Sequence, residues 1–202
     1  MSATRARLTA EQRRAAVLDC ACVIFSKSSY RATTTAEIAR QAGVTEPILY
    51  RHFESKRHLY LACLESAWDS CRSMWEAAVA GEEDPALWVG AMGSAYLEAK
   101  DKRGLIANLW VQALTEASDD AEIRRFLRRY VREVHDFVAG VIRRSQELGG
   151  IPKDRDPEAE AWIFISVGLL ATVSKRLGGM VDSEFPGIVA SRRRWMTGRD
   201  DV

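Results

Sequence analysis

Hydroxyl, imidazole and cationic side chains gather in one short stretch of this 202-residue chain, residues 34–56, which reads TTAEIARQAGVTEPILYRHFESK. Such groups donate hydrogen bonds or carry positive charge, and both properties suit contact with the phosphate oxygens of a nucleic acid. Catalysis has less support, because the chain shows no phosphate loop, no Ser/His/Asp order and no metal-ligand spacing. Two of the three histidines, His52 and His58, lie in or beside this stretch. We therefore expect a binding protein that is not an enzyme and needs no metal or cofactor.

Two short helices joined by a glycine turn must position these side chains. We expect one helix over Thr35–Ala42, begun by a Thr34/Glu37 capping box, and a second over Thr45–His52. Gly43 supplies the turn, since it tolerates positive φ without a steric penalty. Five small or apolar residues can face inward and lock the two helices together: Ile38, Ala39, Val44, Leu49 and Phe53. This is the helix-turn-helix pattern, whose second helix fits the major groove of B-DNA.

The same residues carry a family resemblance. The chain contains Thr33-Thr34-Thr35, Ile38-Ala39, Gly43-Val44-Thr45, Leu49-Tyr50-Arg51-His52-Phe53 and Ser55-Lys56, in that order. In residues and order it resembles the signature of the TetR/AcrR family of ligand-responsive transcriptional regulators. The motif covers residues 33–60, and an expected first helix over Ala10–Lys27 extends the likeness to the N-terminal quarter. The rest of the chain matches in length, helix count and lack of strands.

The resemblance implies which side chains would touch DNA. Contacts to backbone phosphates are assigned to Thr35, Thr45, Tyr50, His52 and Lys56. Lys56 would sit at the N-terminus of the fourth helix, where its charge and the helix dipole both favour an anion. The base-reading face is assigned to Glu46, Pro47, Ile48 and Arg51. Pro47 replaces the glycine that is commonest at its position, which changes the fit to the groove and not the fold.

Several of these assignments keep an alternative. Tyr50 could be a half-buried core aromatic, His52 could be merely exposed, and Arg51 could contact a phosphate instead of a base. Four arginines near the N-terminus could form a minor-groove arm: Arg5, Arg7, Arg13 and Arg14. Their alternative is a solvated tail followed by an exposed first helical turn.

The whole chain is expected to be all-α, with about nine helices and no strands. The remaining helices are expected near residues 55–79, 84–100, 103–117, 118–148, 156–178 and 184–196. We assign residues 1–54 to a helix-turn-helix DNA-binding head and residues 55–202 to a helical body for effector binding and dimerisation. Residues 1–60 hold 10 Lys/Arg and 5 Asp/Glu, whereas residues 61–202 hold 19 and 23. A basic head on an acidic body is what one nucleic-acid-facing end predicts.

Two further features bound the class of protein. The chain has no run of about 18 apolar residues and no apolar N-terminal segment, so we expect a cytoplasmic protein with no membrane contact. The four cysteines, Cys20, Cys22, Cys63 and Cys71, lack a metal-ligand spacing and are expected to act as small buried hydrophobes.

Aromatic residues at helical spacing predict a ligand cavity in the body. Trp68 and Trp75 fall seven apart, and Trp88, Met92 and Tyr96 fall four apart. Ligand sites are mostly apolar with a few placed polar groups. The predicted lining is Trp68, Trp75, Trp88, Met92, Tyr96, Asn108, Trp110, Gln112, His135 and Trp162, and Phe137 could help to complete the cavity. The alternative for each aromatic residue is an ordinary place in the core.

The eighth and last helices are predicted to form a dimer interface, the four-helix arrangement that the family uses. Small residues there allow close approach of two helices, and apolar ones supply the contact. The predicted interface residues are Ala161, Ile165, Gly168, Leu169, Thr172 and Ile188.

These patterns together predict a homodimeric DNA-binding transcriptional regulator. The specific hypothesis is a repressor that a small, largely apolar ligand releases from a palindromic operator. The alternative is a DNA-binding protein of the same fold without such a ligand, controlled by a protein partner or acting in chromosome organisation. The two differ in the body, which would hold a cavity on the order of several hundred Å³ in the first case and a packed interior in the second.

Overall fold

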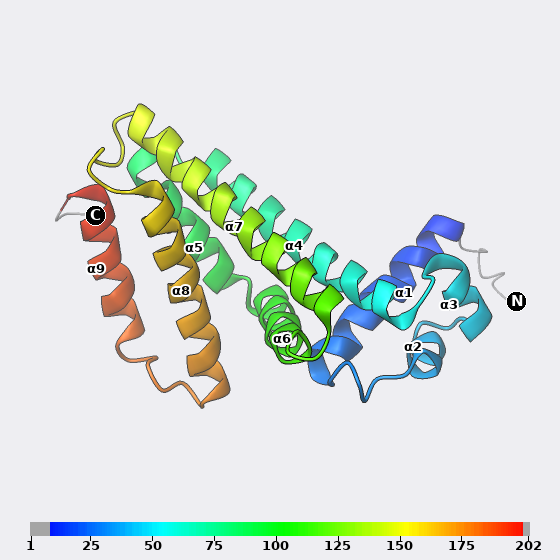
Figure 1. The fold of residues 1–202 in the computed structure, drawn as a ribbon. Coiled ribbons are helices and arrows are strands. Elements are labelled where there is room, and N and C mark those ends of the chain that lie inside the picture. Colours follow the sequence, from blue (N-terminus) through cyan, green and yellow to red (C-terminus); the bar gives the residue numbers. More distant parts are fainter. Residues whose placement is uncertain (1–8, 200–202) are drawn as a thin grey trace, which may run out of the picture. The chain divides into compact units, whose positions relative to one another are not determined.

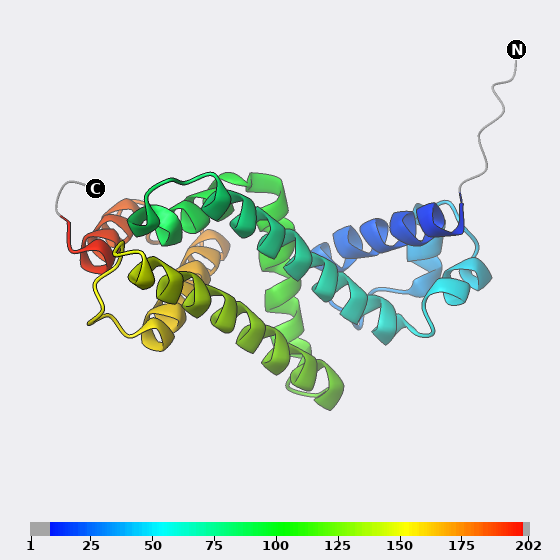
Figure 2. The ribbon, with the colours of Figure 1, turned by 90° about the horizontal axis from the view of Figure 1, so that it is seen from above.

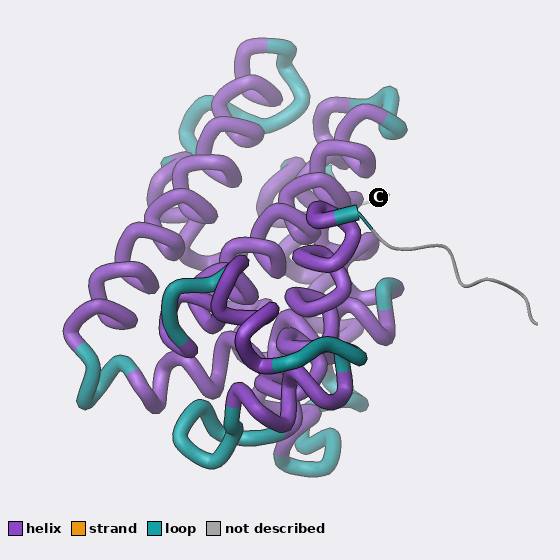
Figure 3. Tube along the Cα trace, turned by 90° about the vertical axis from the view of Figure 1, so that its right-hand side faces the viewer, coloured by secondary structure: helices purple, strands orange, loops and turns teal. Residues whose placement is uncertain are grey.

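A computed structural model describes residues 9–199 of the chain, and these residues form helices and loops without strands (Figures 1 and 3). The helices are α1 (Ala10–Lys27), α2 (Thr35–Gln41), α3 (Glu46–His52), α4 (Lys56–Ala80), the short 3-10 helix η1 (Pro85–Leu87), α5 (Trp88–Glu98), α6 (Lys100–Glu116), α7 (Ala121–Glu147), α8 (Pro157–Arg176) and α9 (Phe185–Thr197). The all-α class is confirmed, and the predicted helix ends agree to within a few residues. Within residues 9–199, no helix is both long and apolar enough to cross a membrane.

The first two helix starts show how local sequence sets the helix ends. At α1, Thr9 Oγ1 accepts from the Gln12 N–H at 3.1 Å, and Gln12 Oε1 accepts from the Thr9 N–H at 2.9 Å, which completes a capping box. At α2, Thr34 Oγ1 accepts from the Glu37 N–H at 3.2 Å, but the Glu37 carboxylate accepts instead from the Gln41 side chain. The predicted Thr34/Glu37 box is therefore only half formed.

The described chain divides into two compact units. The first comprises residues 9–70 and 101–127, and the second comprises residues 71–100 and 128–199. The DNA-binding head predicted over residues 1–54 thus shares its unit with the first part of α4 and with α6. Physical contacts account for this: Phe25 of α1 and Tyr60 of α4 meet edge to face with ring centroids 4.9 Å apart.

The core of the first unit includes an apolar stripe on α1. Val17, Ala21 and Phe25 of this stripe are fully buried. Facing them on α4, the Cys63 thiol donates to the Leu18 carbonyl at 3.9 Å. Burial raises the pKa of Cys63 well above its usual value, so this thiol stays protonated and packs as a hydrophobe.

In the second unit an aromatic cluster and a buried carboxylate with two partners hold the helices together. Trp75 stacks on Phe137 at 6.0 Å and meets Phe164 edge to face at 5.5 Å. The helices α8 and α9 lie side by side (Figures 1 and 2) because the buried Glu160 carboxylate accepts from Trp195 Nε1 at 2.9 Å and also pairs with Arg192. A carboxylate removed from water needs such partners to offset its desolvation.

Close backbone packing joins the loop after α7 to η1. A Cβ placed on Gly150 would lie 2.5 Å from the Ala86 nitrogen and 2.6 Å from the Pro85 carbonyl carbon. Ser145 reinforces the contact, since its hydroxyl donates to the Pro85 carbonyl at 2.7 Å. Only glycine lets the two backbone segments come this close.

We expect Gly150→Ala to lower the free energy of unfolding by about 1–3 kcal/mol, because the added methyl group overpacks a rigid backbone contact. Gly140→Ala is the matched control, since a Cβ at Gly140 within α7 meets nothing within 4 Å. That control should gain about 0.5–1 kcal/mol from helix propensity. Urea denaturation of both variants measures the difference, and equal stability of the two would contradict the packing argument.

Candidate nucleic-acid interface

The segment from α2 to α3 forms a helix-turn-helix whose inner face is packed into the core. Ile38, Ala39, Leu49 and Phe53 are buried as predicted, whereas Val44 is half-buried. The turn places Gly43 at φ 67°, the left-handed region that favours glycine. With its inner side chains locked in the core, α3 can present only its outer side to a partner.

The outer side of α3 carries the residues predicted to contact DNA. Thr45, Pro47, Tyr50 and Arg51 are exposed, while Glu46, Ile48 and His52 are half-buried. Tyr50 is 45% exposed. These residues share one short helix of the width that a major groove admits.

Thr35 ties the start of α2 to α3. Its buried hydroxyl donates to Glu46 Oε1 at 2.5 Å and lies 3.1 Å from the Tyr50 hydroxyl oxygen. The Thr35 hydroxyl, assigned from the sequence to a phosphate, is thus committed within the protein. In this arrangement it positions Glu46 and Tyr50 at the outer surface.

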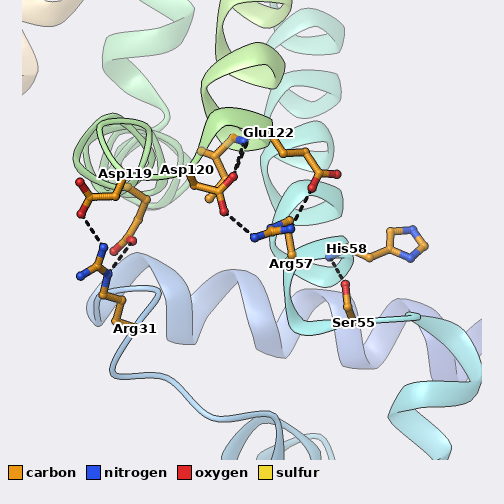
Figure 4. A network of polar contacts seen from close by, with 9 residues as sticks. Arg31, Ser55, Arg57, His58, Asp119, Asp120 and Glu122 are labelled. Carbon is orange, nitrogen blue, oxygen red and sulfur yellow. Dashed lines mark hydrogen bonds and ion pairs between the residues drawn. The ribbon is translucent and has the colours of Figure 1, made fainter.

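The start of α4 combines a helix cap with a cation. Ser55 Oγ accepts from the His58 N–H at 3.0 Å (Figure 4). His58 Nδ1 accepts from the Glu54 N–H at 3.3 Å. The Lys56 ammonium lies 4.4 Å from the centroid of the Tyr30 ring. Burial lowers the pKa of Lys56, and the carboxylate of Glu116 opposes that shift. The Lys56 ammonium therefore faces the Tyr30 ring.

Of the four arginines near the N-terminus, the structure describes Arg13 and Arg14. Arg5 and Arg7 lie outside the described residues. Arg13 is half-buried on α1, and the Arg14 guanidinium stacks 4.9 Å above the Phe53 ring. A guanidinium on an aromatic face covers this edge of the head core.

A partly open cavity of about 480 Å³ lies in the second unit. Its lining residues are Glu76, Val79, Ala80, Glu82, Trp88, Phe137, Val141 and Arg144. Trp88 was in the predicted lining and Phe137 was predicted to help complete it, whereas Val141 and Arg144 were missed. The signal was available, because Val141 and Arg144 follow Phe137 by four and seven residues on the same face of a helix.

The other predicted lining residues do not border this cavity. Trp68, Asn108, Trp110 and Gln112 belong to the first unit, and Trp75, Met92 and Tyr96 belong to the second. Trp75 and Met92 are buried, and Tyr96 is half-buried. Trp75 reaches the cavity indirectly, since it backs the lining residue Phe137.

His135 and Trp162, also predicted for the cavity, pack on each other where α7 meets α8. Their ring centroids are 4.5 Å apart, and Trp162 is 40% exposed. His135 Nδ1 lies 2.9 Å from Asp136 Oδ1, and Nε2 lies 3.1 Å from the Glu158 carbonyl oxygen. The ligand atoms of these three residues could converge on a metal ion. Oxygen atoms already face both ring nitrogens, however, and Glu158 also pairs with Arg143, so we interpret the cluster as an ion-pair network.

An exposed apolar stripe runs along α8 and ends at the C-cap residue Leu177. Its members recur at helical spacing: Trp162, Leu169, Val173 and Leu177. Among the predicted dimer residues, Leu169 lies on this stripe, and Ala161 is fully buried on the same helix. Four others are half-buried: Ile165, Gly168, Thr172 and Ile188. A contiguous exposed apolar surface is typical of a protein–protein interface.

Residues 17–63 match the model of the bacterial regulatory proteins of the tetR family, and residues 85–167 match the C-terminal model of BetI-type transcriptional repressors. Together the two matches cover more than half of the chain. The chain belongs to the TetR family. Members of this family are transcriptional regulators, and the helix-turn-helix described above is its DNA-binding element.

Individual TetR-family relatives match over most of their length. The chain is 29% identical over 167 residues to the transcriptional activator FasR of Mycolicibacterium smegmatis, covering 82% of this chain and 70% of FasR. It is 28% identical to the regulator TtgR of Pseudomonas putida, covering 85% of this chain and 90% of TtgR.

Solved structures show the same fold. A TetR-family regulator from Rhodococcus sp. superposes with a TM-score of 0.80 at 18% identity, covering 91% of this chain and 98% of that one. AibR, solved in complex with isovaleryl coenzyme A and operator DNA, superposes with a TM-score of 0.61 at 21% identity. That match covers 79% of this chain and 85% of AibR.

We expect Thr35→Val to destabilise the head by about 1.5–3 kcal/mol, because the substitution leaves the Glu46 carboxylate without its buried donor. Operator affinity should also fall, since the freed carboxylate would face the phosphates. Thermal unfolding and fluorescence anisotropy with operator DNA measure the two effects. Thr45→Val is the control on an exposed threonine whose hydroxyl makes no cap; a similar loss of stability there would remove the special role of Thr35.

Proposed function

We propose that this TetR-family regulator is a homodimeric repressor that a small, largely apolar ligand releases from a palindromic operator. The observation that carries the proposal is the outer side of α3, where Pro47, Tyr50 and Arg51 are exposed on a helix whose inner side is fully committed. In this assignment Glu46, Pro47, Ile48 and Arg51 read bases. Thr45, Tyr50, His52 and Lys56 hold phosphates, with Thr35 joining them if its hydroxyl leaves Glu46.

Repression and ligand control rest on separate support. The C-terminal match is to a repressor model, although the relative FasR is an activator. The related fold of AibR holds both a ligand and operator DNA. The cavity of about 480 Å³ falls within the usual size of ligand pockets and favours a ligand over a packed interior. Trp88, Phe137 and Val141 would contact the apolar part of that ligand.

The stripe on α8 is the proposed dimer surface. Leu169 lies at its centre, and the small residues Gly168 and Thr172 beside it would allow two helices to approach closely. A two-fold dimer also matches a palindrome, because each head then meets an equivalent half-site.

Selection of bound sequences from random DNA, followed by a ligand screen for release, tests the proposal directly. Enrichment of a palindrome and its release by an apolar compound are the expected results. A selected site without two-fold symmetry would count against the dimer, and failure of every compound class to release DNA would favour control by a protein partner.

Substitutions on α3 and α4 should separate base reading from phosphate contact. We expect Arg51→Ala to cost about 1–3 kcal/mol at one operator position and to relax specificity there. Lys56→Ala should weaken binding to all sequences and flatten the dependence of affinity on salt, because one fewer counterion is released. Titrations at several salt concentrations measure both. Equal losses for Arg51→Ala on operator and random DNA would move Arg51 to the phosphate group.

A charge on the α8 stripe should break the dimer. We expect Leu169→Glu to yield monomers in sedimentation analysis, because two buried carboxylates would face each other across the interface. Operator affinity should fall with it through lost bivalency. The control is Leu148→Glu, which changes another exposed leucine outside the stripe and should leave the dimer intact. A full-strength Leu169→Glu dimer would place the interface elsewhere.

A further inference from the structure

Tyr50, Thr35 and Glu46 form a hydrogen-bond relay in the DNA-binding head. The buried Thr35 hydroxyl lies 2.5 Å from Glu46 Oε1 and 3.1 Å from the Tyr50 hydroxyl oxygen. Thr35 begins α2, whereas Glu46 and Tyr50 lie four residues apart on α3 and so share one face of that helix. Tyr50 is exposed and Glu46 is half-buried. The relay thus joins two side chains of the outer surface through a hydroxyl that lies inside.

The number of protons in the relay fixes its direction. A carboxylate only accepts hydrogen bonds, so the single proton of the Thr35 hydroxyl must be donated to Glu46. The contact between Thr35 and Tyr50 then has one available donor, which is the Tyr50 hydroxyl. The protons therefore run from Tyr50 to Thr35 to Glu46, and both point toward the carboxylate.

At this point the outer surface consequently presents hydrogen-bond acceptors. Glu46 Oε1 is held by Thr35, and among the described residues no other group donates to this carboxylate. The Tyr50 oxygen has its proton engaged by Thr35 and keeps an accepting lone pair. Under the proposed function Tyr50 holds a phosphate, which its O–H can do only by leaving Thr35.

A carboxylate on a face that meets DNA needs a donor from the DNA. It is repelled by the phosphates, so it weakens binding wherever no base supplies a hydrogen bond. In the major groove guanine presents two acceptors, thymine presents an acceptor and a methyl group, and adenine presents an acceptor beside its amino group. Cytosine alone presents an amino donor without a neighbouring acceptor. Cytosine is therefore the base that a fixed carboxylate fits best.

We propose that Glu46 reads the amino group of a cytosine in each half-site of the operator, and that Thr35 and Tyr50 are positioning residues that hold its carboxylate. The proposal rests on the proposed function, in which Glu46 belongs to the base-reading face, and it adds the base that Glu46 selects. Because the Thr35 hydroxyl already fixes Oε1, the carboxylate can meet the base with little further loss of side-chain freedom.

Selection of bound sequences from random DNA, followed by titration of operators changed at single base pairs, tests the base preference. We expect wild-type protein to prefer cytosine at one position of each half-site by about fivefold or more over each other base. Glu46→Ala should reduce that preference to less than about twofold and keep the preferences at other positions, because the acceptor is gone. Its affinity for random DNA should not fall, since the substitution removes a negative charge.

Glu37→Ala is the matched control. Glu37 is another half-buried carboxylate of the head, and it accepts from the Gln41 side chain at 3.2 Å. This substitution removes the same charge without removing the proposed acceptor, so the cytosine preference should stay within about twofold of the wild-type value. Loss of the cytosine preference in Glu37→Ala as well would assign it to the charge of the head and reject reading by Glu46.

Substitutions of Thr35 and Tyr50 separate positioning from a merely structural role. Thr35→Ser keeps the hydroxyl and should keep the cytosine preference, whereas Thr35→Val keeps the shape without the donor and should lower the preference by about twofold to fivefold. Tyr50→Phe should lower it by about twofold, and it carries the test if Thr35→Val does not fold. Equal weakening of Tyr50→Phe on all sequences would place the Tyr50 O–H on a phosphate and reject the relay.

Failure of this inference can be told apart from failure of the proposed function. A selected palindrome without a cytosine preference that Glu46→Ala relaxes would reject reading by Glu46 and leave the proposed function standing. A wild-type protein that selects no palindrome would reject both. Circular dichroism of every variant confirms that it is folded.

Discussion

Two seven-residue helices cannot hold their shape by themselves. Isolated helices shorter than about 12–15 residues are marginal in water, and α2 and α3 fall well below that length. Their stability must come from burial, which Ile38, Leu49 and Phe53 supply by giving up all exposure to solvent. The outer side chains of α3 have fixed positions because the inner side chains are fully packed. A substitution that loosens this packing would also disorder the outer side chains.

Local signals carried most of the fold. The capping pair at Thr9, the left-handed Gly43 and the proline-led start of α8 each act within a few residues, so the sequence predicts them directly. Where two local partners compete, prediction weakens. Glu37 could reach back to its cap or forward to Gln41, and the structure has it facing Gln41.

The contacts inside the body and at the back of the head were harder to predict from the sequence, because they join residues far apart in the chain. Arg31 and Asp119 are separated by 88 positions, and Arg57 and Glu122 by 65. Helical spacing predicts which face of its helix an aromatic residue occupies, but it does not predict which residue of another helix that side chain contacts. Trp162 shows the effect, since its stripe is regular while its ring packs on His135 and remains partly exposed.

The buried cysteines give the molecule its own chemical reporters. Cys22 and Cys63 lie in the core of the first unit and Cys71 in the second, all without disulfides. Burial raises the pKa of Cys71 to about 12 and that of Cys63 well above its usual value. Alkylating reagents need an accessible thiolate, so these sulfurs react only when their surroundings transiently open. Labelling followed residue by residue, with the half-buried Cys20 as the fast internal standard, would therefore time the breathing of each unit without an engineered probe.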